Sequence, residues 1–153
     1  MRFTIERRFN APREVVYEAF TDLARLPDRI EAIDRIEPEN EGEPLRFQDG
    51  SAFRETRTIM GKQATETMRI EDVLPQQRFT LTSESHGCAY RFEHTFREGA
   101  GSCTVTLEGE CRPTTLGARI MMVVFFPMRG MMPKLINKDF DAIHASLESA
   151  PDA

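Results

Sequence analysis

The sequence has no tryptophan and only three cysteines and three histidines among its 153 residues. Cys88, Cys103 and Cys111 lack the C-x-x-C spacing that is typical of zinc and redox sites. The histidines stand in neither an H-x-x-x-H nor an H-E-x-x-H arrangement. The sequence therefore gives no support to a metal site, and we expect a protein that uses no metal and no cofactor.

A block of positive charge is also missing. The formal net charge is −5, and arginine and lysine are interspersed with glutamate and aspartate along the whole chain. Proteins that bind nucleic acid usually carry a basic patch or stripe. We therefore expect no nucleic-acid partner.

Long hydrophobic runs are absent too. The longest, Ile120 to Met128, is about half of the roughly 20 residues that a membrane-spanning helix needs, and it contains Pro127. The N-terminal MRFTIERRF carries charges at positions 2, 6, 7 and 8 and has no apolar stretch of signal-peptide length. We expect a cytoplasmic protein without a transmembrane segment, and we interpret Ile120 to Met128 as a buried or ligand-facing helix rather than an interfacial membrane anchor.

What is present is the composition of an ordinary globular domain, with 40% hydrophobic and 29% charged residues. A chain of this length suits one domain, with a real core and room for an internal cavity. We predict that residues 1–149 form this domain and that residues 150–153 form a short tail.

The N-terminal third combines one strand pattern with two short helix patterns. Apolar and polar residues alternate over positions 2–9, which predicts a half-buried strand. Asn10-Ala11-Pro12 then supplies a helix N-cap candidate and a proline for the first turn of a helix of about three turns. A second short helix is expected over residues 23–29, a short strand over 33–37, and a loop over 37–50.

From Ser51 to Cys111 the pattern predicts a meander of antiparallel strands, whose turns set the register. Met60-Gly61-Lys62-Gln63 has the glycine of a type II′ turn, which places Arg57 opposite Glu66. The other turns are expected at 74–77, 86–87 and 98–101. They pair Val73 with Arg78, Ile70 with Leu81, Met68 with Ser83, Ser83 with Tyr90, Leu81 with Phe92, Phe79 with His94, Phe92 with Leu107 and Cys88 with Cys111.

All four turns keep one parity, so the apolar side chains of the meander share a face. The central row of that face is Phe53, Ile70, Leu81, Phe92 and Leu107. Glu55, Arg57 and Glu66 lie on the same face nearer one end. The opposite face is rich in threonine and arginine and is expected to meet solvent, so the inner face must cover another element.

That element is expected to be a C-terminal helix. Its apolar residues recur every three or four positions: Met132, Ile136, Phe140, Ile143 and Leu147. This spacing predicts a helix with one face to bury. The preceding residues 116–132 are apolar on nearly every side, so we expect them to be covered. Pro127, Gly130 and Pro133 break this stretch and are placed to form a movable gate.

Three segments carry a resemblance to a known family. They are IERRFNAPREVVYEAFTD (Ile5 to Asp22), EDVLPQQRFTL (Glu71 to Leu81) and KLINKDFDAIHASLE (Lys134 to Glu148). The chain resembles the START-like, or Bet v 1-like, superfamily, and within it the bacterial polyketide cyclase/dehydrase and lipid transport group. The resemblance implies an α+β helix-grip fold, in which a curved antiparallel sheet of about seven strands wraps around a long C-terminal helix, with two short helices after the first strand. The tryptophan that members often carry in the second short helix is replaced here by Pro27-Asp28-Arg29-Ile30.

The resemblance also implies a deep cavity between the sheet and the C-terminal helix. Such a cavity takes a hydrophobic small molecule, such as a lipid or a polyketide or other aromatic compound, and the protein would act as a carrier or sensor. A homodimer is compatible with this role. The residues expected to bind the ligand are Phe53, Glu55, Arg57, Glu66, Met68, Leu81, Ser83, Tyr90, Phe92, His94, Phe125, Met128, Met132 and Ile136.

The polar members of this set admit two interpretations each. Arg57 and Glu66 either hold a ligand oxygen and orient it or form a partly solvated salt bridge. His94 is either an acid or base or, as we favour, a hydrogen-bonded wall residue. Tyr90 either donates to a ligand carbonyl or packs in the core with its hydroxyl at the rim.

Two other functions compete with the binding role. One is an enzyme of the aromatase/cyclase type, which would fold a polyketide-like chain and promote aldol condensation or dehydration through Arg57, Glu66, Tyr90 or His94; the sequence carries no catalytic signature, so we favour binding. The other is a protein-interaction module of the co-chaperone or antitoxin-like kind. An exposed apolar patch over Ile120 to Met132 together with a closed cavity would favour that module.

Overall fold

The structure is a computed structural model that describes residues 1–149. The predicted tail, residues 150–153, lies outside the described residues. The elements follow in the order β1 (Arg2–Phe9), α1 (Arg13–Thr21), α2 (Leu26–Arg29), β2 (Ile33–Pro38), β3 (Ala52–Ile59), β4 (Lys62–Leu74), β5 (Arg78–Ser85), β6 (Cys88–Gly99), β7 (Ser102–Pro113), α3 (Leu116–Val124), the 3₁₀ helix η1 (Phe126–Met128) and α4 (Met131–Glu148).

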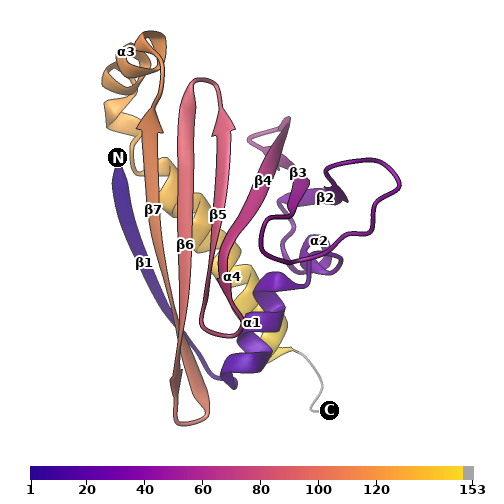
Figure 1. Cartoon of the computed structure of the whole chain (residues 1–153). Helices are drawn as coiled ribbons and strands as arrows, with labels where there is room; N and C mark the ends of the chain where they lie inside the picture. The colour runs from indigo at the N-terminus through magenta and orange to yellow at the C-terminus, as the bar shows by residue number, and fades with distance from the viewer. Residues whose placement is uncertain (150–153) are drawn as a thin grey trace.

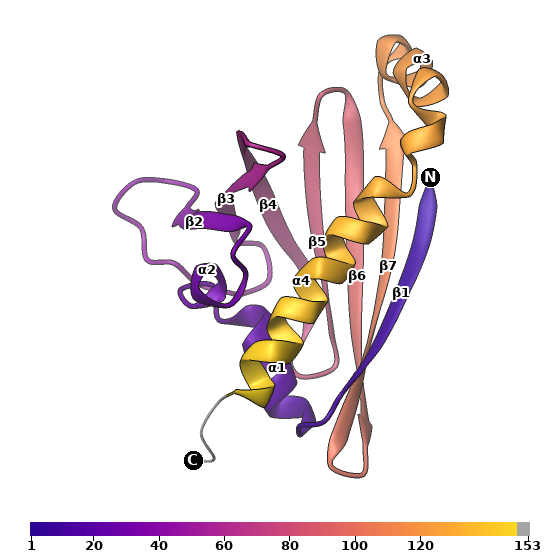
Figure 2. The ribbon, with the colours of Figure 1, turned by 180° about the vertical axis from the view of Figure 1, so that it is seen from behind.

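The strands form one antiparallel sheet of seven strands in the order β1-β7-β6-β5-β4-β3-β2 (Figure 1). The long helix α4 runs diagonally across one face of this sheet, and α1 and α2 lie at one end of it (Figure 2). Strands β1 and β2 are therefore the two edge strands of the sheet. Helix α4 covers the curved face between them. The predicted α+β helix-grip fold is confirmed.

An aromatic cluster joins the sheet to the helices. The ring of Phe20 in α1 packs edge-on against Phe9 of β1 and Phe140 of α4, with ring centroids 5.7 and 5.2 Å apart. All three side chains are buried. Edge-to-face contacts at these distances add to the stabilisation from burial alone. The cluster fixes where α4 crosses the sheet, and the cavity described below lies beside it.

The predicted pairing of β5 with β6 is confirmed. Leu81 lies opposite Phe92, Ser83 opposite Tyr90 and Phe79 opposite His94, around the His86-Gly87 turn. Gly87 has a φ of 74°, and a Cβ there would lie 2.6 Å from the Thr115 hydroxyl oxygen. Both the backbone conformation and the lack of space therefore require glycine at this turn.

The registers of two other hairpins were predicted wrongly, each by two residues. Arg57 lies opposite Ala64 rather than Glu66, because Met60 and Gly61 close the β3–β4 hairpin as a two-residue turn with φ values of 52° and 77°. Both central residues at positive φ define a type I′ turn, not the type II′ turn that the single glycine indicated.

In the β6–β7 hairpin the predicted four-residue loop is also a two-residue turn, between Gly99 and Ser102. Phe92 therefore lies opposite Gly109 instead of Leu107, and Cys88 lies opposite Pro113 instead of Cys111. A shift of two residues leaves every side chain on the face predicted for it. The inner face of the sheet is consequently the one that the sequence pattern indicated.

Strands β4 and β5 pair over a short stretch only. Ile70 lies opposite Leu81 as predicted, but a bulge between Glu71 and Leu74 displaces Val73 from Arg78. Beyond Arg69 and Thr82 the ladder ends, so the predicted pairing of Met68 with Ser83 does not form. From that point the two strands diverge toward the β3–β4 turn (Figure 1).

Helix α4 buries the predicted stripe. Phe140 and Ile143 are almost fully buried, while Met132, Ile136 and Leu147 are partly buried. Helix α1 begins at Arg13, and its cap is Pro12, whose carbonyl accepts hydrogen bonds from the next turn; the expected side-chain cap does not form.

Residues 116–130, which comprise α3 and η1 and are called the apolar tip below, depart from the prediction. They were expected to be covered, but they extend beyond the end of β7, where no sheet remains to cover them (Figures 1 and 2). Their large apolar side chains are exposed. None of the described helices combines the length and the apolar character that crossing a bilayer requires.

Candidate functional site

A cavity of about 280 Å³ lies between the inner face of the sheet, α4 and the α1–α2 segment. Its wall is mostly apolar, and only a few polar groups reach it. Ten of the fourteen residues expected to bind a ligand line it: Phe53, Glu55, Arg57, Glu66, Met68, Leu81, Phe92, His94, Met132 and Ile136. The sheet supplies one wall because residues two apart along each strand point to the same side.

The main polar feature of the cavity is an ion-pair cluster around Arg57. Its Nη1 atom lies 2.8 Å from Asp139 Oδ2, and its Nε atom donates to the carboxylate of Glu55. Glu55 and Arg57 are two residues apart on β3 and so face the same way, while Asp139 comes from α4 across the cavity. The cluster thus ties the helix to the sheet at the cavity wall.

Asp139 is the member of this cluster with the most perturbed titration. Burial raises the pKa of its carboxyl group to about 6; the guanidinium of Arg57 opposes this shift, and the charge of Glu55 adds to it. The pKa of Arg57 is affected by burial, which lowers it, but Glu55 and Asp139 outweigh burial and raise it. Arg57 is therefore always charged and already engaged by two carboxylates.

Glu66 adds a third carboxylate to the same wall. It lies directly opposite Glu55 on the neighbouring strand, which puts the two Cβ atoms about 5 Å apart. The Ser83 hydroxyl donates a hydrogen bond to Glu66 Oε2 at 3.5 Å, across the point where β4 and β5 diverge. The predicted ion pair of Arg57 with Glu66 does not form. The hairpin register differs from the prediction by two residues, so Glu66 lies opposite Glu55 instead of Arg57.

Three carboxylates and one guanidinium leave this part of the cavity negative. Like charges facing one another in a poorly hydrated site repel, and a ligand that donates hydrogen bonds or carries positive charge relieves the repulsion. An anionic ligand would add to it. Within residues 1–149, no group of three or more His, Cys, Asp or Glu side chains is arranged to hold a metal ion.

His94 lies at the apolar part of the cavity. Its ring stacks on Phe79 with centroids 4.4 Å apart, and Nδ1 lies 3.3 Å from the Phe92 carbonyl oxygen. Burial lowers the pKa of His94 to about 4, so the ring is neutral at neutral pH. Because the carbonyl can only accept, Nδ1 is the donor, which leaves Nε2 as an acceptor.

Tyr90 and Ser83 do not line this cavity; both line a larger hollow of about 600 Å³, which is described below. Tyr90 stacks on Phe92 with centroids 6.3 Å apart, and it sits opposite Cys111. Burial is the main cause that raises the pKa of Tyr90, and the nearby thiols of Cys111 and Cys88 add to the shift. All three cysteines are free thiols.

The remaining two expected residues, Phe125 and Met128, lie in the apolar tip and are about half exposed. Conversely, the cavity wall includes residues that were not expected, foremost Asp139 and Leu135 of α4 and several from the α1–α2 segment. Asp139 stands three residues after Ile136 and four before Ile143, so helical spacing places it on the buried face. A charged residue usually indicates an exposed position, which is why Asp139 was not among the expected residues.

A larger hollow of about 600 Å³ lies on the outer face of the sheet. Charged side chains from four strands line it, including Arg69, Glu84, Arg91 and Glu110. The inner cavity is smaller but is the one with an apolar wall and convergent polar groups, which is typical of a small-molecule site.

A sequence model described as polyketide cyclase / dehydrase and lipid transport matches residues 1–150. The chain belongs to this family. No curated protein sequence matches the chain significantly.

Solved structures with the same fold come from several kinds of protein. A START superfamily protein from Mycobacterium smegmatis superposes with a TM-score of 0.69 at 12% identity, covering 96% of this chain and 97% of that one. Norcoclaurine synthase from Thalictrum flavum gives 0.71 at 16% identity, with 99% and 89% covered. The di-domain ARO/CYC protein BexL from the BE-7585A biosynthetic pathway gives 0.74 at 14% identity, with 97% of this chain and 46% of that chain covered. At these identities the similarity establishes the fold.

Proposed function

We propose that this protein binds a hydrophobic small molecule in the cavity beneath α4, as a carrier or sensor. The observation that carries the proposal is an apolar cavity whose few polar groups converge on one side, around Arg57, Glu55 and Asp139. Its volume of about 280 Å³ is just below the range of about 300–1,000 Å³ that is typical of small-molecule sites. A compact aromatic compound or a single acyl chain therefore fits better than a two-chain lipid.

The charge of the polar cluster narrows the ligand further. Because three carboxylates surround one guanidinium, we propose that the polar end of the ligand is an amine or a hydroxyl group rather than a carboxylate. The norcoclaurine synthase structure, which contains dopamine and hydroxybenzaldehyde, supports the general class of an apolar ring with a donor group. Arg57 then serves to hold the two carboxylates in place instead of binding an anion itself.

Native mass spectrometry of freshly purified protein, followed by extraction and identification of any bound compound, is the first test. Displacement of Nile red from the cavity then compares dodecylamine, dodecanol and dodecanoic acid below their micelle-forming concentrations. We expect dodecylamine to displace the dye at a concentration about tenfold lower than dodecanoic acid, since one favourable charge contact contributes about 1.4 kcal/mol. Tighter binding of dodecanoic acid would contradict the proposed polarity.

A matched pair of variants connects this preference to the cluster. Asp139→Asn removes one carboxylate from the cavity and should reduce the preference for dodecylamine. Asp141→Asn makes the same chemical change two residues away, at a side chain that is exposed and pairs with Arg7 on the surface. It should leave the preference for dodecylamine unchanged. If both variants changed this preference equally, the charge of the cavity would not be its cause.

The two competing functions have less support. An aromatase/cyclase mechanism needs its polar groups to converge on one spot, but Tyr90 does not line the cavity that Arg57, Glu66 and His94 line. An interaction module was expected to combine an exposed apolar patch with a closed cavity. The patch exists, but so does an apolar cavity with polar groups in its wall, so binding of a small molecule is the better-supported proposal.

A further inference from the structure

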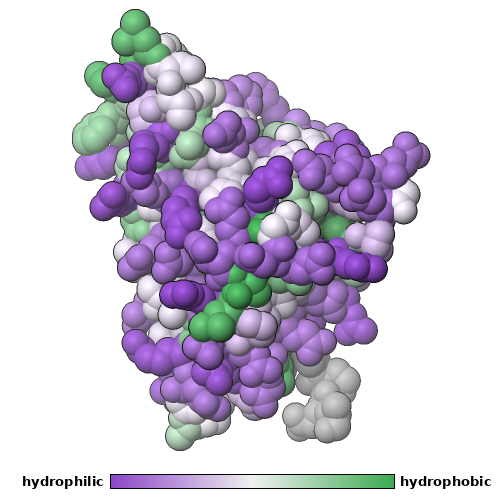
Figure 3. Space-filling view, viewed as in Figure 1, coloured by the Kyte–Doolittle hydropathy of each residue, from purple (hydrophilic) through white to green (hydrophobic). Residues whose placement is uncertain are grey.

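The apolar tip stands apart from the rest of the molecule. It projects past the sheet at the end where the chain begins, and its surface is predominantly apolar (Figures 1 and 3). Leu116, Val123 and Phe126 expose 74%, 77% and 58% of their surface. A large exposed apolar surface is rare in a soluble monomer and usually marks a site that a protein partner or a membrane covers.

The tip is apolar on most of its circumference. At 100° per residue, the exposed apolar side chains form one continuous arc of about 200°, which runs from Val123 through Val124 and Met121 to Phe125 at the end of the helix. Ala118 is the one residue of α3 that is buried. An ordinary surface helix has one apolar stripe and one polar face. A cover that meets this helix on one side only would therefore leave much of its apolar surface in water.

The base of the tip is held firmly, so the tip is not a loose segment. The Thr115 hydroxyl caps α3 by accepting a hydrogen bond from the Ala118 amide at 3.1 Å. Thr114 donates to the Gly87 carbonyl of the β5–β6 turn through both its amide and its hydroxyl group, at 2.7 and 2.9 Å. The sequence thus builds a projecting helix with satisfied backbone groups.

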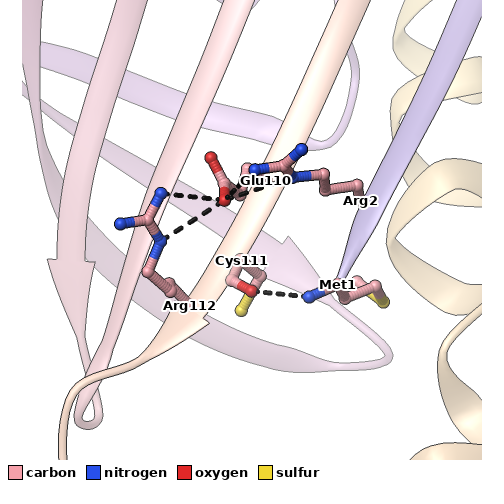
Figure 4. Close-up of polar contacts among 5 residues, drawn as sticks. All are labelled: Met1, Arg2, Glu110, Cys111 and Arg112. Atoms are coloured by element: carbon pink, nitrogen blue, oxygen red, sulfur yellow. Dashed lines mark hydrogen bonds and ion pairs between the residues drawn. The ribbon is translucent and has the colours of Figure 1, made fainter.

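The segment that contains the tip carries only positive charges, although the whole chain has a net charge of −5. No aspartate or glutamate occurs between residues 111 and 138, a stretch that contains Arg112, Arg119, Arg129, Lys134 and Lys138. Beside the tip's base, Glu110 is engaged by Arg112 and Arg2, and the N-terminal ammonium group donates to the Cys111 carbonyl (Figure 4). Glu110 is thus neutralised by two arginines, while Glu84 of β5 lies at the same end of the sheet, two strands away from Arg112.

Arg129 is also placed as lipid-facing elements usually place a cationic side chain. The Arg129 guanidinium lies 4.1 Å from the centroid of the Phe126 ring, so a charged group and an aromatic ring occupy the same level of the tip. Long cationic side chains can keep their charge at a headgroup layer while their neighbours enter the apolar layer. Helix α3 has nine residues, about 14 Å, which reaches into one leaflet and no further.

We propose that the apolar tip inserts into the interfacial layer of an anionic lipid bilayer. A bilayer covers all sides of an inserted helix at once, whereas a protein partner covers one side. A second copy of this chain docked tip to tip would bring Arg119 and Arg129 of both copies together. Anionic lipids instead complement these cations.

This inference goes beyond the proposed function and does not depend on it. The two are connected in space, because α4 begins immediately after the tip, and Met132 in its first turn lines the cavity. Docking through the tip would therefore hold one end of the cavity wall against the bilayer. A carrier of an apolar compound would load or release its ligand there.

The test is co-sedimentation of the full chain with vesicles. We expect it to bind vesicles of mixed phosphatidylcholine and phosphatidylglycerol, to bind phosphatidylcholine alone more weakly, and to be released by salt. The variant Val123→Ser/Phe126→Ser should lower the partition coefficient at least about tenfold. The control Val15→Ser/Leu74→Ser changes two exposed apolar side chains elsewhere and should bind as the wild type does.

The preference for anionic lipid and the insertion of the tip into the bilayer are tested separately. Arg119→Gln/Arg129→Gln should lose the preference for phosphatidylglycerol, while Arg8→Gln/Arg97→Gln, at two exposed arginines of the sheet, should keep it. Because the chain has no tryptophan, Val123→Trp supplies a single reporter whose emission should shift to the blue with mixed vesicles. Leu74→Trp should show no shift.

Three results would overturn the proposal. The first is a wild-type chain that stays in the supernatant with mixed vesicles. The second is equal binding by the tip variant and its control. The third is a dimer of the wild type that the tip substitutions dissociate while vesicle binding is absent, which would make a second copy the cover of the tip.

Discussion

The carboxyl group of Asp139 is subject to opposing forces that make it a pH-sensitive part of the cavity. Burial raises its pKa from 3.8 to about 6, even though Arg57 favours the charged form. The folded protein therefore binds the proton more tightly than the unfolded chain does. The resulting contribution to stability is complete below about pH 4 and is lost as the pH rises through about 6.

Asp139→Asn should remove this pH dependence. The amide is neutral at every pH. The free energy of unfolding of the variant minus that of the wild type should therefore increase by about 1–3 kcal/mol as the pH rises from 4 to 7. The measurement is urea denaturation of both proteins across this range. Asp141→Asn, on the exposed side of the same helix, is the control. A difference between wild type and Asp139→Asn that stays constant with pH would contradict the explanation.

At the scale of elements, the β3–β4 turn combines a favourable and an unfavourable residue. Gly61 adopts its φ of 77° freely, but Met60 holds a φ of 52°, which a residue with a Cβ adopts at a cost. The Met60 side chain is exposed, so it contributes little packing in return. The turn is therefore a place where a substitution can stabilise the hairpin without touching the cavity.

Met60→Asn should raise the free energy of unfolding by about 0.5–1 kcal/mol, since Asn-Gly is the preferred pair for a type I′ turn. Met60→Val should lower it, because a β-branched residue resists positive φ. Chemical denaturation of the three proteins measures both changes. If Met60→Asn were no more stable than Met60→Val, the turn geometry would not be the cause.

The same turn shows what the sequence can and cannot predict. Alternation along the strands predicted the inner face correctly, because a register error of two residues leaves Arg57 and Glu66 on that face. It could not predict their partners, since these depend on which turn residue takes positive φ. The contact of Arg57 with Asp139 depends further on how α4 crosses the sheet, which local spacing does not encode. The sequence could not predict the exposure of Val123 and Phe126 for a similar reason: hydropathy predicts that they need a cover, not that residues 1–149 provide none.

At the scale of the whole molecule, the cavity and the apolar tip divide the apolar residues into two groups with different surroundings. Residues such as Phe53 and Met68 are buried around an internal space, whereas those of the tip face outward. A protein that leaves a cavity in its core gives up packing that a filled core would have. A bound ligand restores these contacts, so occupancy of the cavity and stability of the fold should be linked.

Filling the cavity with a side chain should break this link. Dodecylamine at about 100 times its dissociation constant should stabilise the wild type by about 2.7 kcal/mol, which corresponds to a rise in Tm of about 5–10 °C for a domain of this size. In Met68→Trp the indole ring occupies the cavity, and the rise should largely disappear while the far-ultraviolet circular dichroism stays that of the folded protein. Thr67→Trp places the same ring on the exposed face of the same strand and should retain the full rise. If Met68→Trp kept the wild-type rise in Tm, the ligand would be bound outside the cavity, because one strand presents its successive side chains to opposite faces and only position 68 points inward.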